Sequence, residues 1–210
     1  MTKLVLIRHG HVEGIDPPRF RGRAELELTD LGHAEARAVA SRIARDWSPR
    51  AIYTSPMGRC RATAAHIAEA CGTETIVSEG LNDLDYGAWQ GHSHDEIRER
   101  FPDQFSAWFA TPQLVRFPDG ESLQDLIART ADMLRRVVER HPDKGDTVVL
   151  VGHDSVNRAL LLQLLDMPIA TYWRITQTPC TINEIDIEGD RVRALRINET
   201  GHLESVSLGA

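Results

Sequence analysis

Short apolar segments alternate with longer amphipathic segments along most of this chain, and this alternation constrains its fold most strongly. The expected strands cover residues 3–7, 51–54, 75–77, 147–151, 180–187 and 191–198. The expected helices cover residues 29–46, 57–71, 93–101, 122–141 and 155–165. Strands that alternate with helices predict an α/β fold. We expect a three-layer sandwich, in which helices cover both faces of a mostly parallel or mixed central sheet.

The length of the chain predicts its domain organisation. At 210 residues it is of the size that forms one compact domain, so we expect a single domain over residues 1–210. Segment 92–121 begins with a capping-box pattern, Ser93 with Glu96, and continues into an aromatic stretch that contains prolines. This segment is expected to form a lid or a small insertion within that domain.

The net charge of the chain argues against two classes of partner. The net charge is −7, which argues against broad electrostatic binding to nucleic acid or to an anionic membrane. An anionic ligand must therefore bind in a local basic pocket.

The apolar run at the N-terminus is too short for a signal sequence or a membrane span. The three cysteines are odd in number and lack metal-ligand spacing, which is typical of free thiols, so we expect a cytoplasmic protein.

Polar residues follow four of the expected strands at the points where the strands end. His9 follows the first, residues 55–61 follow the second, Asp83 lies in the loop after the third, and residues 152–154 follow the fourth. Ligands of such sheets bind at the carboxyl ends of the strands. The sequence therefore predicts a binding site at this edge of the sheet.

The residue types at this edge favour phosphoryl chemistry. A neutral imidazole such as that of His9 is a good nucleophile toward phosphorus. The guanidinium of Arg8 can hold phosphate oxygens by two charge-assisted hydrogen bonds, and a second arginine and histidine can stabilise the developing charge. Strict strand alternation would point Arg8 and His9 to opposite faces. Both reach one pocket only if the chain leaves the strand at His9, and we expect Gly10 to permit that turn.

Six sequence blocks, in order, carry a resemblance to a known family. They are "LIRHG", "FRGRAELELTDLG", "SPMGRCRATA", "LNDLDYGAWQG", "DGES" and "VVLVGHDSVNRALL". Together they resemble the histidine phosphatase superfamily in its phosphoglycerate-mutase-like branch. The resemblance implies that His9 is transiently phosphorylated and that Arg8, Arg59 and His153 bind the phosphate. It also implies phosphoryl transfer to His9 and hydrolysis of the phosphohistidine, with no metal and no cofactor.

The proton donor has two candidates. The family usually has a glutamate where this chain has Asp83, and aspartate is one methylene shorter. A different branch of the superfamily uses an aspartate directly after its second histidine, which makes Asp154 the rival. That branch continues the RHG motif with a different pattern from the one found here. We therefore favour Asp83 as the general acid.

Four further residues are candidates for substrate binding. Arg21 and Gly22 are placed to line the entrance to the phosphate site, and Asp154 lies beside the second histidine. Glu121 in "DGES" is a candidate either for the pocket wall or for the support of an arginine. The acidic and histidine-rich segment that begins at His92 is interpreted as a polar helix start rather than a metal site.

Three functions remain open on the sequence alone. The favoured one is hydrolysis of a small phosphorylated metabolite through phospho-His9. The alternatives are a phosphoglycerate-mutase-type phosphotransferase and a phosphate-binding module that has lost catalysis. The apolar helix expected over 155–165 is deeply buried or lies at a subunit contact, which makes a homodimer possible.

Overall fold

The computed structural model describes residues 2–142 and 145–207, and its core is one six-stranded sheet with the order β3-β2-β4-β1-β5-β6. The strands are β1 (Thr2–Arg8), β2 (Pro49–Thr54), β3 (Thr75–Val77), β4 (Thr147–Gly152), β5 (Ile182–Glu188) and β6 (Arg191–Glu199). Strands β1 to β4 pair in parallel, whereas β5 and β6 run antiparallel at one edge. The sheet is therefore mixed, as the sequence allowed.

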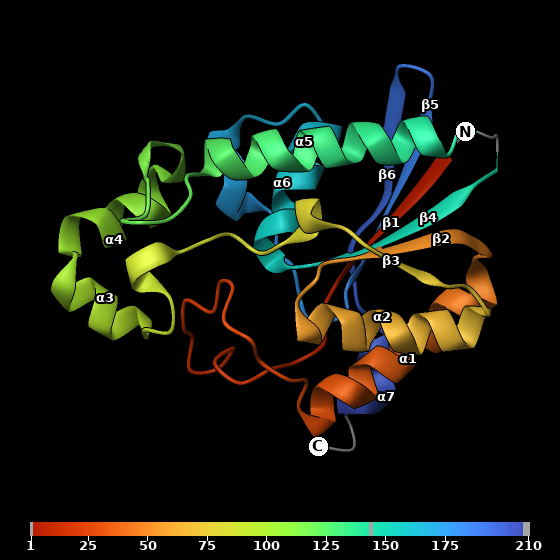
Figure 1. Cartoon of the computed structure of the whole chain (residues 1–210), viewed down its shortest axis with the longest axis horizontal. Helices are drawn as coiled ribbons and strands as arrows, with labels where there is room; N and C mark the ends of the chain where they lie inside the picture. Colours follow the sequence, from red (N-terminus) through yellow and green to blue (C-terminus); the bar gives the residue numbers. More distant parts are fainter. Residues whose placement is uncertain (1, 143–144, 208–210) are drawn as a thin grey trace.

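Helices cover both faces of this sheet, as Figure 1 shows. The α-helices are α1 (Asp30–Asp46), α2 (Gly58–Cys71), α3 (His94–Arg100), α4 (Pro102–Ala110), α5 (Leu123–Arg140), α6 (Asp154–Leu164) and α7 (Glu204–Ser207). In the view of Figure 1, α5 and α6 lie above the sheet, and α1, α2 and α7 lie below it. The predicted three-layer α/β sandwich is confirmed.

The alternation of side chains in β1 builds both halves of the core. Leu4 and Leu6 belong to the apolar cluster beneath α5 and α6, whereas Val5 and Ile7 belong to the cluster against α1 and α2. All four side chains are fully buried. A central strand that is covered on both faces reads as a continuous apolar run, which is why the opening segment lacks polar positions.

The aromatic segment after α3 is partly helical. Within the stretch that the sequence predicts as a lid or a small insertion, α4 occupies Pro102–Ala110 and a short 3-10 turn follows at Pro112–Leu114. Proline at the first helical position fits here because its missing N–H has no partner in a helix anyway. Trp108 of α4 is buried among aromatic rings that include Phe117 and Tyr172. In Figure 1, α3 and α4 project beyond the sheet.

Helix α6 is apolar because it is buried within this chain. Nine of its residues are buried, and it packs against α5 and β1. The feature that suggested a homodimer thus has an intramolecular cause, and the homodimer remains an untested prediction. No helix within the described ranges combines the length and apolar character needed to cross a membrane.

Candidate active site

The end of β1 delivers two buried polar residues to the carboxyl edge of the sheet. Strand β1 ends at Arg8, and the N–H of His9 donates to the carbonyl of Gly152 at the end of β4, at 3.0 Å. Arg8 is 7% exposed and His9 is 1% exposed. The chain leaves the strand at His9, which is where Arg8 and His9 required it to turn if they were to share one pocket. Both residues can therefore belong to one site despite the alternation within the strand.

Gly10 is required for a different reason from the predicted one. Its φ is not positive, so the turn needs no left-handed conformation there. Instead, a Cβ at this position would lie 2.5 Å from the carbonyl oxygen of Gly32 in α1. The glycine allows close approach of two backbones, which holds the segment after His9 against α1.

The ring of His9 is oriented by its own neighbour. Its Nδ1 lies 2.7 Å from the carbonyl oxygen of Gly10. A carbonyl oxygen can only accept, so Nδ1 carries the proton and Nε2 carries the lone pair. His9 is thus held as the tautomer whose Nε2 can act as a nucleophile.

His153 faces His9 from the end of β4. The two rings meet edge to face with centroids 5.2 Å apart. Nε2 of His153 lies 2.9 Å from Oγ of Ser55, and Nδ1 accepts from Nε of Arg59 at 3.3 Å. Because the guanidinium can only donate, Nδ1 is unprotonated and the Nε2 proton faces the serine.

Arg59, in the first turn of α2, connects three segments of the site. Its side chain is fully buried. One of its terminal nitrogens donates to the carbonyl of Gly22 at 2.6 Å and to Oδ2 of Asp83 at 3.0 Å, and the other donates to the carbonyl of Ala24 at 2.8 Å. A buried charge of this kind is stable only when hydrogen bonds satisfy it.

Arg8 retains an unsatisfied donor. One of its two terminal nitrogens donates to the carbonyl of Gln177. Its Nε is buried and has no acceptor within the described part of the chain. A buried donor without an acceptor costs about 1–3 kcal/mol. A phosphate oxygen is the kind of acceptor that would remove this cost.

The two candidate acids lie in different surroundings. Oδ2 of Asp83 lies 3.0 Å from Arg59 and 3.4 Å from Nδ1 of His153, while Oδ1 accepts from the hydroxyl of Ser155 and the N–H of Leu84. Both carboxylate oxygens of Asp154 instead accept from Nε of Arg158, at 3.0 and 3.1 Å. The geometry brings Asp83, not Asp154, together with His9, Arg8, Arg59 and His153.

Arg21 and Gly22, the two residues expected at the entrance, both lie beside the buried cluster. Arg21 is half-buried, and its pKa lies below the usual value because of burial and the nearby charges of Arg8 and Arg59. Its guanidinium donates to the carbonyl of Gly14. Gly22 acts through its carbonyl, which accepts from Arg59, and its φ of 48° favours glycine. Arg21 thus adds positive charge beside the cluster.

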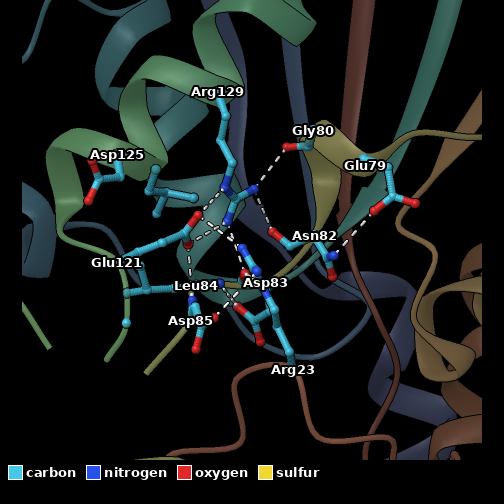
Figure 2. Close-up of polar contacts among 12 residues, drawn as sticks. Arg23, Glu79, Gly80, Asn82, Asp83, Leu84, Asp85, Glu121, Asp125 and Arg129 are labelled. Atoms are coloured by element: carbon cyan, nitrogen blue, oxygen red, sulfur yellow. Dashed lines mark hydrogen bonds and ion pairs between the residues drawn. The ribbon is translucent and has the colours of Figure 1, made fainter. Parts of the chain in front are cut away.

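Glu121 supports the loop of Asp83 through two arginines, and support of an arginine is one of the two roles that the sequence suggested for it. Figure 2 shows its carboxylate beside the turn that carries Asp83, with dashed lines to Arg23 and Arg129. Its Oε2 also accepts from the N–H of Asp85 at 3.0 Å. The sequence did not identify either arginine. Arg129 carries no motif, and only the position of Arg23 two residues after Arg21 could have drawn attention to it.

Burial and positive charge keep both histidines neutral. The pKa of His9 lies well below its usual range because of burial, Arg59, His153 and Arg8, in that order. The pKa of His153 is also lowered, first by burial and then by Arg59 and Arg8. A neutral imidazole is the form that can attack phosphorus, so His9 is able to act as a nucleophile at neutral pH and below.

These pKa shifts predict that the protein loses stability in mild acid. In the unfolded chain each histidine takes up a proton near pH 6.5, whereas in the folded chain both remain neutral, so stability falls as the pH drops below about 6.5. Each histidine should contribute a slope of about 1.4 kcal/mol per pH unit. Urea unfolding between pH 5 and 7 measures this slope. His153→Gln should reduce it, and an unchanged slope in that variant would show that His153 is charged in the fold.

Comparison with known proteins agrees with this geometry. A family model described as the histidine phosphatase superfamily (branch 1) matches residues 4–200. The chain belongs to the histidine phosphatase superfamily. It is 32% identical to phosphoserine phosphatase 1 of Hydrogenobacter thermophilus over 97% of this chain and 95% of that protein. It is 34% identical to a 2,3-bisphosphoglycerate-dependent phosphoglycerate mutase of Mesorhizobium japonicum over 77% of this chain and 80% of that one.

A solved structure extends the agreement to the fold of the superfamily. The structure of Bacillus stearothermophilus YhfR superposes with a TM-score of 0.90 and 28% identity, over 97% of this chain and 100% of that one. The expected family, the phosphoglycerate-mutase-like fold and the class of enzyme, a histidine phosphatase, are confirmed. Within residues 2–142 and 145–207, no group of three or more histidine, cysteine or acidic side chains is placed to hold a metal ion.

Proposed function

We propose that this histidine phosphatase hydrolyses small phosphomonoesters with His9 as nucleophile and Asp83 as general acid. The observation that carries the proposal is the orientation of His9, whose Nδ1 donates to Gly10 and leaves Nε2 with its lone pair. The ring of His153 meets this ring edge to face, and Arg8 and Arg59 place positive charge near it. Two guanidinium groups with one carboxylate among them leave a net positive charge, which suits a phosphate dianion.

The first step transfers the phosphoryl group to the enzyme. Nε2 of His9 forms a bond to phosphorus while the bond from phosphorus to the ester oxygen breaks. Asp83 donates its proton to that oxygen, so the leaving group departs as an alcohol.

The second step returns the enzyme to its starting state. The carboxylate of Asp83 accepts a proton from a water molecule as the water oxygen bonds to phosphorus. The bond from Nε2 to phosphorus breaks, and inorganic phosphate leaves. The guanidinium groups of Arg8 and Arg59 stabilise charge on the phosphoryl oxygens in both steps.

We further propose phosphoserine as the substrate class to test first, in the cytoplasm. Support comes from the name of the Hydrogenobacter relative and from Arg21, whose charge beside the phosphate cluster suits a substrate carboxylate. The three thiols, Cys60, Cys71 and Cys180, are all free, which is typical of a reducing compartment.

Phosphate release from a panel of esters tests the substrate class. We expect phosphoserine to give a kcat/KM at least about tenfold above that of ethanolamine phosphate, because a single charge-assisted hydrogen bond to the carboxylate contributes about 1.5–3 kcal/mol. Arg21→Gln should remove most of this preference. Equal kcat/KM values for the two esters would contradict the assignment of a carboxylate-bearing substrate.

Phosphoglycerate mutase activity is the second candidate, and the similarity to the Mesorhizobium mutase favours it. A mutase passes the phosphoryl group from His9 back to another hydroxyl of the bound phosphoglycerate. The discriminating measurement is phosphate release from 3-phosphoglycerate without a bisphosphorylated primer. A phosphatase releases phosphate steadily, whereas a mutase releases little and interconverts the two isomers when the primer is added.

A further inference from the structure

Arg129 of α5 uses every donor of its guanidinium on the loop that carries Asp83 and on Glu121. Its Nε and one terminal nitrogen donate to the two oxygens of Glu121, at 2.9 and 3.0 Å. The same terminal nitrogen donates to the carbonyl of Asp83 at 2.9 Å, and the other donates to the carbonyls of Gly80 and Asn82, at 3.1 and 2.7 Å. An arginine has five N–H donors, so none is left over.

Glu121 accepts hydrogen bonds from Arg129, from Arg23 and from the N–H of Asp85, and the dashed lines in Figure 2 mark these contacts. Oε1 accepts from Arg23 and Arg129, both at 2.9 Å, and Oε2 accepts from Arg129 and from the N–H of Asp85, both at 3.0 Å. Nε of Arg23 also donates to the carbonyl of Asp83 at 3.2 Å. The carbonyl of Asp83 is therefore held by two arginines from different parts of the chain.

Tight packing against α5 adds a second constraint on this loop. A Cβ on Gly80 would lie 2.5 Å from Cβ of Met133. The start of the loop thus lies directly on the helix that carries Arg129. Because an aspartate carboxyl has one methylene between it and the backbone, its reach is set by where the backbone lies.

We propose that Arg129, together with Glu121, is a positioning residue that sets the distance of the Asp83 carboxyl from the leaving oxygen. This inference rests on the proposed role of Asp83 as general acid. The hydrogen bonds of Arg129 described above all end on residues 80–83 and Glu121, so it acts through Asp83 rather than on the phosphate. Small displacements of a general acid are costly because proton transfer requires hydrogen-bond distance.

Leaving-group dependence tests the proposal. Arg129→Gln should lower kcat/KM for an alkyl phosphate such as phosphoserine on the order of 10²-fold, because a misplaced acid cannot protonate the poor leaving group. For p-nitrophenyl phosphate, whose leaving group departs without a proton, the loss should stay within about threefold. Arg136→Gln is the matched control. It lies on the same helix, its ion pair with Asp132 is exposed, and it should change neither value by more than about twofold.

A double variant separates positioning from general destabilisation. In an Asp83→Asn background, Arg129→Gln should cause no further loss with the alkyl phosphate, because the group that it positions is already absent. If Arg129→Gln lowers kcat/KM equally for both esters, its role is structural and the inference is overturned.

The result for Asp83→Asn alone keeps this inference distinct from the proposed function. If Asp83→Asn shows no leaving-group dependence, the assignment of the acid fails, and the inference fails with it. If Asp83→Asn shows that dependence and Arg129→Gln does not, only the inference fails. Should Arg129→Gln not fold, Glu121→Gln replaces it. That variant places an amide N–H₂ against Arg129 or the N–H of Asp85, and the same selective loss is expected.

Discussion

Replacing His9 with alanine is expected to lower kcat by about six orders of magnitude, the scale of loss seen when a covalent nucleophile is removed. The reason is that the second histidine of the site is not free to replace it: His153 directs its Nδ1 to Arg59 and its Nε2 proton to Ser55. The measurement is steady-state phosphate release, together with a circular dichroism spectrum to verify the fold. His92→Ala changes a partly exposed histidine outside the site, so it is the matched control and should keep full activity.

The same variant separates binding from catalysis. Arg8 and Arg59 remain in place in His9→Ala, so the affinity for inorganic phosphate should change by less than about tenfold, or 1.4 kcal/mol. If the wild-type protein and His9→Ala had the same activity on every ester, the enzyme would not use His9 as its nucleophile. A large loss of phosphate affinity in the variant would instead place the ring among the main binding contacts.

Replacing Asp83 with asparagine is expected to slow the release of poor leaving groups by about 10²–10⁴-fold and to affect nitrophenyl esters little. The amide is close in shape to the carboxyl and can still accept from the hydroxyl of Ser155 and the N–H of Leu84. It cannot donate a proton to an alkoxide. A plot of log kcat/KM against the pKa of the leaving alcohol should therefore be steeper for the variant than for the wild type.

Asp154→Asn is the control for this prediction. Both oxygens of Asp154 accept from Arg158, and its side chain is 27% exposed, so the slope of the same plot should stay at the wild-type value. If Asp154→Asn steepens the plot and Asp83→Asn does not, the acid has been assigned to the wrong aspartate. In that case the ion pair with Arg158 must open when substrate binds.

The cluster of buried histidines and arginines could be predicted from the sequence because its members follow strand ends. In a sheet whose strands run in parallel, residues placed after β1, β2 and β4 must meet at one edge, whatever the details of the loops. His9, Arg59 and His153 follow this rule, and Arg8 joins them because the strand ends beside it. Amphipathic periodicity predicted the ends of α1 and α5 to within a residue or two, because each helix has one apolar face.

The hydrogen bonds that hold the loop of Asp83 could not be predicted, because Arg129 donates to backbone carbonyls of that loop. Arg129 lies on a helix whose sequence shows only an apolar stripe and a charged face, and the acceptors at Gly80 and Asn82 leave no trace in residue identity. Helix α4 was missed for a different reason, since its aromatic residues have weak helix propensity and pack into a tertiary cluster. Gly10 shows that a glycine expected to permit a turn can instead serve close backbone packing.

The central claim is that Nε2 of His9 carries the phosphoryl group during turnover, and trapping that intermediate tests it most directly. The enzyme is mixed with ³²P-labelled phosphoserine, quenched within milliseconds in alkaline detergent, digested and analysed by mass spectrometry. We expect one label per active site, stable to base and lost in acid, on the peptide that contains His9. Label on another residue, or full turnover with no label at any time, would contradict the account.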